Sequence, residues 1–128
     1  MDQHEHHGEL VKGFLKEQKQ IFDSSNQAIY AFLDDDCRVC NDKFAKLLGY
    51  DSPEDWFNVD VKGAFPAAFV SDESQGALVE AYQDAVSNGI ASTIKVSWKK
   101  KSSGIVDTTV ILVPVVYQGH TFALHFVS

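Results

Sequence analysis

The sequence lacks a long hydrophobic run, and this absence excludes one class of protein. No apolar segment approaches the roughly 18 residues that are needed to cross a bilayer. The N-terminus also lacks the basic-then-apolar order of a secretory signal peptide. We therefore expect a cytoplasmic protein.

Basic residues are also scarce. Eleven Lys and Arg residues stand against eighteen Asp and Glu residues, which gives a formal net charge of −7. An acidic surface is repelled by the phosphates of nucleic acids and by anionic lipid headgroups. The composition therefore predicts neither a nucleic-acid partner nor a membrane partner.

Cysteine is limited to Cys37 and Cys40, which is too few for a disulfide scaffold. Their C-x-x-C spacing is compatible with redox chemistry or with half of a metal site. In an extended strand, however, residues three apart point to opposite faces, so we expect the two thiols to serve in packing. A thiol-responsive or metal-responsive protein is the less favoured alternative.

The N-terminal histidines His4, His6 and His7 are clustered in a polar segment. Such a cluster binds transition metals loosely. We expect only adventitious binding there and predict no functional metal site.

Catalytic combinations are missing as well. The chain shows no Ser/His/Asp set, no glycine-rich phosphate loop and no pair of acids placed for proton transfer. The acidic run Asp34–Asp36 is typical of a tight turn, where aspartate is common. We therefore do not expect an enzyme.

What the chain does contain fits one soluble domain of 128 residues, of which 45% are hydrophobic. The pattern predicts a flexible segment over 1–8, an amphipathic helix over 9–22 and the domain proper over 23–128. Within the domain we expect strands at 28–33, 38–40, 94–99, 106–113 and 121–127, with helices beginning at residues 41, 53 and 72. This order is that of an α+β fold with an antiparallel sheet.

The segment Cys40–Tyr50, with the sequence CNDKFAKLLGY, is the most informative part of the chain. Asn41 is expected to cap the start of a short helix. Phe44, Leu47 and Leu48 have the spacing of one apolar helix face, and Gly49 suits a left-handed C-terminal cap.

Together with the flanking elements, this segment resembles the PAS domain family. The matching stretches also include IFDSSNQAIYAFLDDD, ALVEAYQDAVSNG and the closing strands, so that the resemblance covers about Ile21 to Val127. It implies a five-stranded antiparallel sheet with helices on one face, and a role in signal sensing or protein contact. It also implies that the chain is either a stand-alone PAS protein or a piece of a longer signalling protein.

The sheet pattern suggests that both faces are covered. In strand 28–33 and in strand 121–127, apolar residues occupy both sets of alternating positions, whereas a half-exposed sheet has one polar set. The helices within the domain can cover only one face, so the N-terminal helix either lies on its own sheet or contacts a second subunit. PAS resemblance favours a homodimer, with the apolar stripe of that helix as candidate interface: Leu10, Val11, Phe14, Leu15, Ile21 and Phe22.

The resemblance also implies a ligand pocket between the helices and the sheet. The candidate lining residues are Phe44, Leu48, Phe65, Phe69, Tyr82, Trp98 and His125. Because aromatic residues there more often fill a core, an unidentified small ligand is the alternative to a protein-interaction domain without a ligand. His125 is a candidate ligand contact or pH sensor, although a hydrogen-bonded core histidine is the more common case.

The cofactors that are common in the PAS family are not expected. The region VKGAFPAAFV lacks the reactive cysteine of the flavin-binding branch, and the helix ESQGALVEAYQDAVSNG lacks the histidine of the haem-binding branch. Both cysteines precede the helices, which also disfavours a thioester-linked chromophore. The resemblance thus implies a signalling domain that forms a homodimer, with a signalling protein as a further possible partner.

Overall fold

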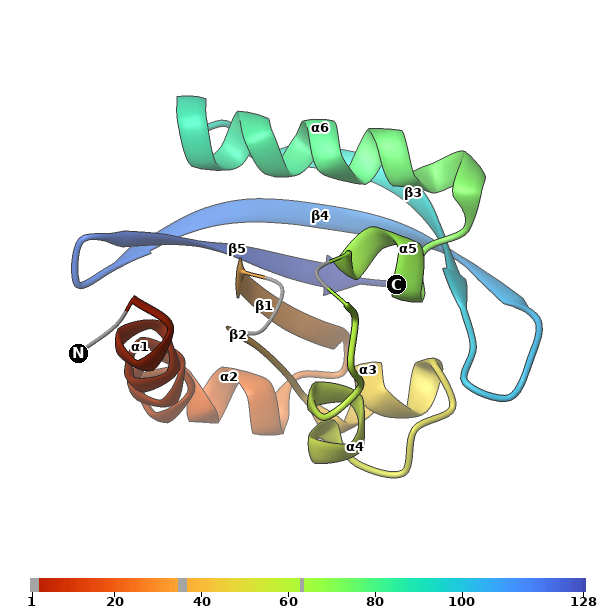
Figure 1. The fold of residues 1–128 in the computed structure, drawn as a ribbon, viewed down its shortest axis with the longest axis horizontal. Helices are drawn as coiled ribbons and strands as arrows, with labels where there is room; N and C mark the ends of the chain where they lie inside the picture. The colour runs from red at the N-terminus through yellow and green to blue at the C-terminus, as the bar shows by residue number, and fades with distance from the viewer. Residues whose placement is uncertain (1–2, 35–36, 63) are drawn as a thin grey trace.

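The computed structural model describes residues 3–34, 37–62 and 64–128, and the side chains after residue 7. Its strands are β1 (Ala28–Asp34), β2 (Cys37–Cys40), β3 (Ser92–Lys99), β4 (Ile105–Tyr117) and β5 (His120–Val127). Its helices are α1 (Gln3–Glu17), α2 (Lys19–Ser24), α3 (Asp42–Leu47), α4 (Pro53–Phe57), α5 (Phe65–Phe69) and α6 (Asp72–Asn88). The strands form one antiparallel sheet in the order β2-β1-β5-β4-β3, and α6 runs along it (Figure 1). The predicted α+β class is confirmed.

The short helices begin where the sequence provides caps. The Oδ1 atom of Asn41 accepts a hydrogen bond from the backbone N–H of Phe44 at 3.0 Å, at the start of α3. The Oγ atom of Ser52 does the same for Asp55 at 3.2 Å, and Pro53 occupies the first turn of α4. Gly89 ends α6 with a φ of 66°, a left-handed conformation that favours glycine.

Strand β4 continues through Pro114, where the sequence was compatible with a strand end or with an edge position. The pairing of β3 with β4 reaches only to Ser92 opposite Leu112, whereas the pairing of β5 with β4 extends to His120 opposite Tyr117. Pro114 therefore lies where β4 has a neighbour on one side only, and a strand tolerates a residue without an N–H there. The predicted turn Asp34–Asp36 lies partly outside the described residues.

Strands β1 and β5 are buried on both faces, as the alternation predicted, whereas β3 and β4 expose alternate residues. One core lies between the sheet and α3 to α6, and it includes Tyr30 and Trp98. The other lies between the sheet and the N-terminal helices, and it includes Ile29, Ala31 and Phe122. Tyr30 and its neighbours Ile29 and Ala31 are each fully buried, so β1 is covered on both sides.

The predicted boundaries at the N-terminus were wrong in two respects. A helix already begins at Gln3, within the segment 1–8 that was expected to be separate from it. The single helix predicted over 9–22 is instead two helices, because the chain breaks at Gln18. After this break Phe22 is buried, whereas its neighbour Ile21 is 46% exposed.

The N-terminal stripe packs on the sheet of its own chain, which is one of the two arrangements that the sequence left open. Phe14 is 1% exposed, and its ring stacks on that of Phe122 with centroids 4.3 Å apart. Leu15 packs at the edge of the same core, and of the six residues only Ile21 is largely exposed. The other buried members of the stripe are Leu10, Val11 and Phe22.

We predict that Phe14→Ala lowers the free energy of unfolding by about 3 to 5 kcal/mol, because it removes a buried aromatic side chain and leaves a cavity. The measurement is urea unfolding followed by circular dichroism. Ile21→Ala, at an exposed position of the same segment, is the control and should stay within about 0.5 kcal/mol of the parent. If Phe14→Ala instead left the stability unchanged and halved the mass in solution, the N-terminal stripe would be a dimer interface.

Candidate functional site

A cavity of about 310 Å³, partly open to solvent, lies between the sheet and helices α5 and α6. Its size is at the lower end of the range for small-molecule sites. The described lining residues are Tyr30, Phe32 and Asp34 of β1, Phe65 and Pro66 of α5, Leu78, Val79 and Tyr82 of α6, and His125 of β5. Aromatic and aliphatic side chains thus dominate the wall, and Asp34 is the one acidic side chain among them.

Three of the seven predicted pocket residues, Phe65, Tyr82 and His125, line this cavity. The other four do not, and each is at most 1% exposed within the adjoining core: Phe44, Leu48, Phe69 and Trp98. The rings of Phe44 and Trp98 lie 5.3 Å apart between centroids and both contact Tyr30. The ring of Phe69 packs against Trp56 and Phe65. The prediction identified the correct layer of the fold but extended the pocket too far toward α3.

Several wall residues were missed by sequence reasoning although the sequence contains a signal for them. Tyr30 and Phe32 are alternate residues of β1, so they point to the same face as Ala28. Leu78 and Tyr82 are four residues apart on α6 and share one helix face. The distance between α6 and the sheet cannot be predicted from the sequence. This distance decides whether these side chains fill the volume between the helix and the sheet.

Tyr30 and His125 form the polar floor of the cavity. They are paired across β1 and β5, and their rings stack with centroids 3.8 Å apart and an interplanar angle of 11°. The Nδ1 atom of His125 lies 3.0 Å from the carbonyl oxygen of Ala123, which fits an Nδ1–H donor. The Tyr30 hydroxyl is buried and has no hydrogen-bond partner among the residues that the structure describes.

Burial keeps both polar rings uncharged. Desolvation lowers the pKa of His125 to about 3, and hydrogen bonding to the backbone at Ala123 and Tyr30 opposes this only in part. Desolvation also raises the pKa of Tyr30 well above its ordinary value. His125 is therefore neutral at physiological pH, which does not fit the role of a pH sensor in that range.

Tyr82 closes the cavity on the side of α6. Its hydroxyl donates a hydrogen bond to the backbone carbonyl of Leu33 at 3.3 Å, and its ring meets that of Phe32 edge to face at 5.2 Å. The helix is thereby joined to β1 directly beside the cavity. Displacement of α6 by a ligand would first disturb these two contacts.

Arg38 of β2 is a buried charge that the sequence analysis did not single out. Its guanidinium donates to the carbonyl oxygens of Trp56 and Val59 at 3.0 Å each, at the C-terminal end of α4. It also lies over the rings of Trp56 and Phe69, at 4.9 and 5.2 Å from their centroids. These contacts make Arg38 the residue that fixes α4 to the sheet.

The two cysteines are placed for packing, on opposite faces of the sheet. Cys37 belongs to the core under α1, whereas Cys40 belongs to the core under α3 to α6. Burial raises the pKa of the Cys40 thiol to about 12, which leaves almost no reactive thiolate at neutral pH. Within the described residues, no group of three or more potential ligands could hold a metal ion.

Comparison with known proteins identifies the family. A family model described as a PAS domain matches residues 17–83, slightly more than half of the chain. The chain therefore belongs to the PAS domain family, whose members act in sensing and signalling. A search of curated proteins finds no match.

Solved structures with this fold are similar in architecture and distant in sequence. A PAS domain of a two-component sensor histidine kinase is 17% identical with a TM-score of 0.66, over 91% of this chain and 96% of that one. A PAS domain from Colwellia psychrerythraea is 20% identical with a TM-score of 0.63, over 90% and 95%. The Rhodobacter sphaeroides LOV protein is 18% identical with a TM-score of 0.64, over 91% and 66%. Within the described ranges, none of the helices has the length and apolar character of a membrane span.

We predict that acid destabilises the fold through His125. Its pKa is about 3 in the folded chain and near 6.5 when unfolded, so the unfolded state binds more protons between these values. The free energy of unfolding should therefore fall as pH decreases below about 6.5, by up to about 1.4 kcal/mol per pH unit.

Urea unfolding at pH 7, 6 and 5 measures this slope, and His125→Phe supplies the comparison because it keeps a ring beside Tyr30 without a titratable group. The variant should show a smaller decline over this interval. Equal slopes for the two proteins would show that His125 is not the responsible group.

Proposed function

We propose that this PAS domain senses a small, uncharged and largely apolar molecule in the cavity between the sheet and α6. The observation that carries the proposal is the cavity itself, because an apolar chamber with two convergent polar groups is the usual form of a small-molecule site. A ligand-free interaction domain is the alternative, and the burial of the N-terminal stripe on its own sheet removes one candidate surface for it.

The chemistry of the wall defines the ligand class. The rings of Phe32, Phe65 and Tyr82 favour a flat or aromatic molecule. Neutral His125 and the unpartnered Tyr30 hydroxyl favour a hydrogen-bonding atom without formal charge, since a buried charge would need a counter-ion. Asp34 and the chain's net charge of −7 disfavour an anion.

The same wall supports the expectation that the ligand is neither flavin nor haem. A covalent flavin adduct needs a cysteine beside the ring system, and neither Cys37 nor Cys40 lines the cavity. A haem iron needs an accessible imidazole, and His125 is 2% exposed and hydrogen-bonded to the backbone. Similarity of fold to the LOV protein does not transfer its cofactor to this chain.

We predict that indole, a small neutral aromatic probe, binds the cavity and raises the melting temperature. Val79→Trp should weaken binding by roughly tenfold or more, about 1.4 kcal/mol, because the new ring occupies part of the cavity. Val86→Trp is the matched control, since Val79 and Val86 lie on α6 with 38% and 39% exposure and only Val79 lines the cavity. Isothermal titration calorimetry measures the affinities.

Two further outcomes decide the proposal. Indole-3-carboxylate should bind more weakly than indole, because its charge cannot be paired in this wall. Native mass spectrometry of the purified protein should show a retained mass of a few hundred daltons or less if the cell supplies the ligand. Equal affinity of indole for Val79→Trp and Val86→Trp would exclude the cavity as the binding site.

A homodimer is the second candidate function, through the exposed part of the sheet face, which together with the N-terminal helix was the expected contact. The face of the sheet that carries α1 also includes Ile111 of β4 and Phe126 of β5, which are paired across the strands. Ile111 is 44% exposed, and Phe126 is half-buried. An apolar cross-strand pair on an exposed part of a sheet is suited to contact with a second copy.

We predict that Ile111→Glu converts such a dimer to a monomer, because it places a charge within an apolar contact. Multi-angle light scattering measures the mass, and Ile105→Glu is the control, since Ile105 is another exposed residue of β4. A monomeric mass for the parent protein would contradict the dimer proposal and leave the ligand proposal unaffected.

A further inference from the structure

A second hollow surface lies between the N-terminal helices and helices α3 and α4. Two adjoining hollows of about 400 and 1050 Å³ share Lys12, Leu15, Cys40, Pro53 and Glu54 and thus form one groove. We call it the basic groove. Within the described residues, the basic groove shares no lining residue with the cavity under α6, so it is a separate surface.

The basic groove concentrates positive charge on an acidic protein. Among the described residues, five of the chain's eleven basic residues line it, against three acidic ones, Asp23, Asp42 and Glu54. These residues carry a formal excess of two positive charges, although the chain as a whole carries −7. The five lysines are Lys12 and Lys16 of α1, Lys19 of α2, and Lys43 and Lys46 of α3.

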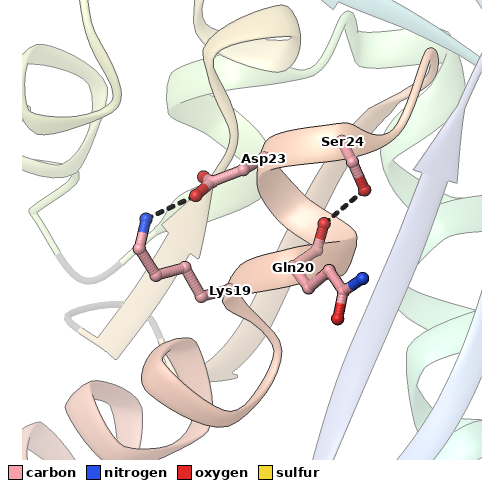
Figure 2. Close-up of polar contacts among 4 residues, drawn as sticks. All are labelled: Lys19, Gln20, Asp23 and Ser24. Atoms are coloured by element: carbon pink, nitrogen blue, oxygen red, sulfur yellow. Dashed lines mark hydrogen bonds and ion pairs between the residues drawn. The ribbon is translucent and has the colours of Figure 1, made fainter.

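Three of these lysines are available to a partner. Lys19 forms an ion pair with Asp23 one turn along α2, as Figure 2 shows, and Lys43 donates to the carbonyl oxygen of Ser25 at 2.8 Å. Lys12, Lys16 and Lys46 have neither a hydrogen bond nor an ion pair within the described part of the chain, and all three are exposed. Two helices thus present uncompensated ammonium groups to the same hollow.

The floor of the groove near these lysines is apolar. Val11, Leu15 and Val39 line it, and Phe57 of α4 adds a large side chain that is 42% exposed. An exposed phenylalanine beside a recessed apolar floor is a common feature of sites that receive a side chain of another protein. The apolar floor and the lysines beside it together match a segment that carries leucine-like and acidic side chains on one face.

We propose that the basic groove docks an acidic amphipathic segment of a partner protein. Charge complementarity selects the acidic side chains, and the recessed floor takes up the apolar ones. An anionic membrane is the less suitable partner, because Val11, Leu15 and Val39 line a hollow and the rest of the protein is acidic. Nucleic acid would use the lysines but not the apolar floor.

The test uses the full chain and a fluorescent peptide of about 12 residues with Glu and Leu at helical spacing, and fluorescence anisotropy measures the affinity. Two control peptides replace Glu by Gln or Leu by Ser, and both should bind at least tenfold more weakly than the parent. Raising the salt concentration from 50 to 500 mM should weaken the parent peptide as well, since exposed charges are screened.

Protein variants locate the site. The double variant K12E/K16E should raise the dissociation constant at least tenfold, whereas K95E/K100E should change it less than twofold. Both variants alter the net charge equally, but Lys95 and Lys100 lie at β3 and beyond it, away from the groove. Phe57→Gln should weaken binding several-fold without changing the charge, and melting curves confirm that each variant is folded.

Three results would overturn the proposal. One is the absence of saturable binding by the Glu/Leu peptide at any salt concentration. A second is equal loss of affinity in K12E/K16E and K95E/K100E, which would indicate attraction by overall charge alone. The third is binding to phosphatidylserine vesicles or to single-stranded RNA, but not to the peptide, that depends on Lys12 and Lys16.

Discussion

Burial of β1 on both faces is the constraint on which the rest of the structure depends. Ile29 and Ala31 point to one side and Tyr30 to the other, and all three are inaccessible to solvent. An antiparallel sheet commonly leaves one face to water, so a central strand without a polar face needs two covering layers. Helices α3 to α6 supply one layer, and the N-terminal helices supply the other. The N-terminal helices are therefore part of the folded domain.

Asn41 connects this strand to the helices. Its Oδ1 atom accepts hydrogen bonds from the backbone of Ile29 and of Phe44, both at 3.0 Å, and its Nδ2 atom donates to Gln27 at 2.9 Å. The buried side-chain amide of Asn41 thus forms hydrogen bonds with backbone groups at the start of β1 and at the start of α3. Phe44 is held 4.7 Å from the ring of Tyr30, and Tyr30 in turn stacks on His125. The floor of the cavity is fixed by this sequence of contacts.

Arg38 is the physical connection between the two hollow surfaces. It binds the carbonyl oxygens at the end of α4, a helix that forms one wall of the basic groove. Its guanidinium also lies 5.9 Å from the ring centroid of Phe65, which lines the cavity. A buried guanidinium held by several carbonyl oxygens is costly to displace, so α4 and α5 are expected to keep a fixed relation. The cavity and the basic groove therefore belong to one rigid framework.

The sequence by itself determined the elements that depend on local chemistry. The cap at Asn41, the Ser52-Pro53 helix start and the double-sided strand pattern could all be predicted, because capping and alternation act over a few residues. The α+β class and the family followed from their order. Four of the seven predicted pocket residues, among them Phe44 and Trp98, do not line the cavity and belong to the adjoining core.

Only the tertiary structure decided which surfaces are covered and which are hollow. The N-terminal stripe had two possible partners, its own sheet or a second chain, and periodicity cannot distinguish them since either one buries the same side chains. The basic groove could not be predicted from the sequence for a similar reason. Its lysines are separated by up to 34 positions in the chain, and a net charge of −7 conceals a local excess of the opposite sign. Local sequence patterns specify the local structure that a residue adopts, whereas long-range packing determines which residues it contacts.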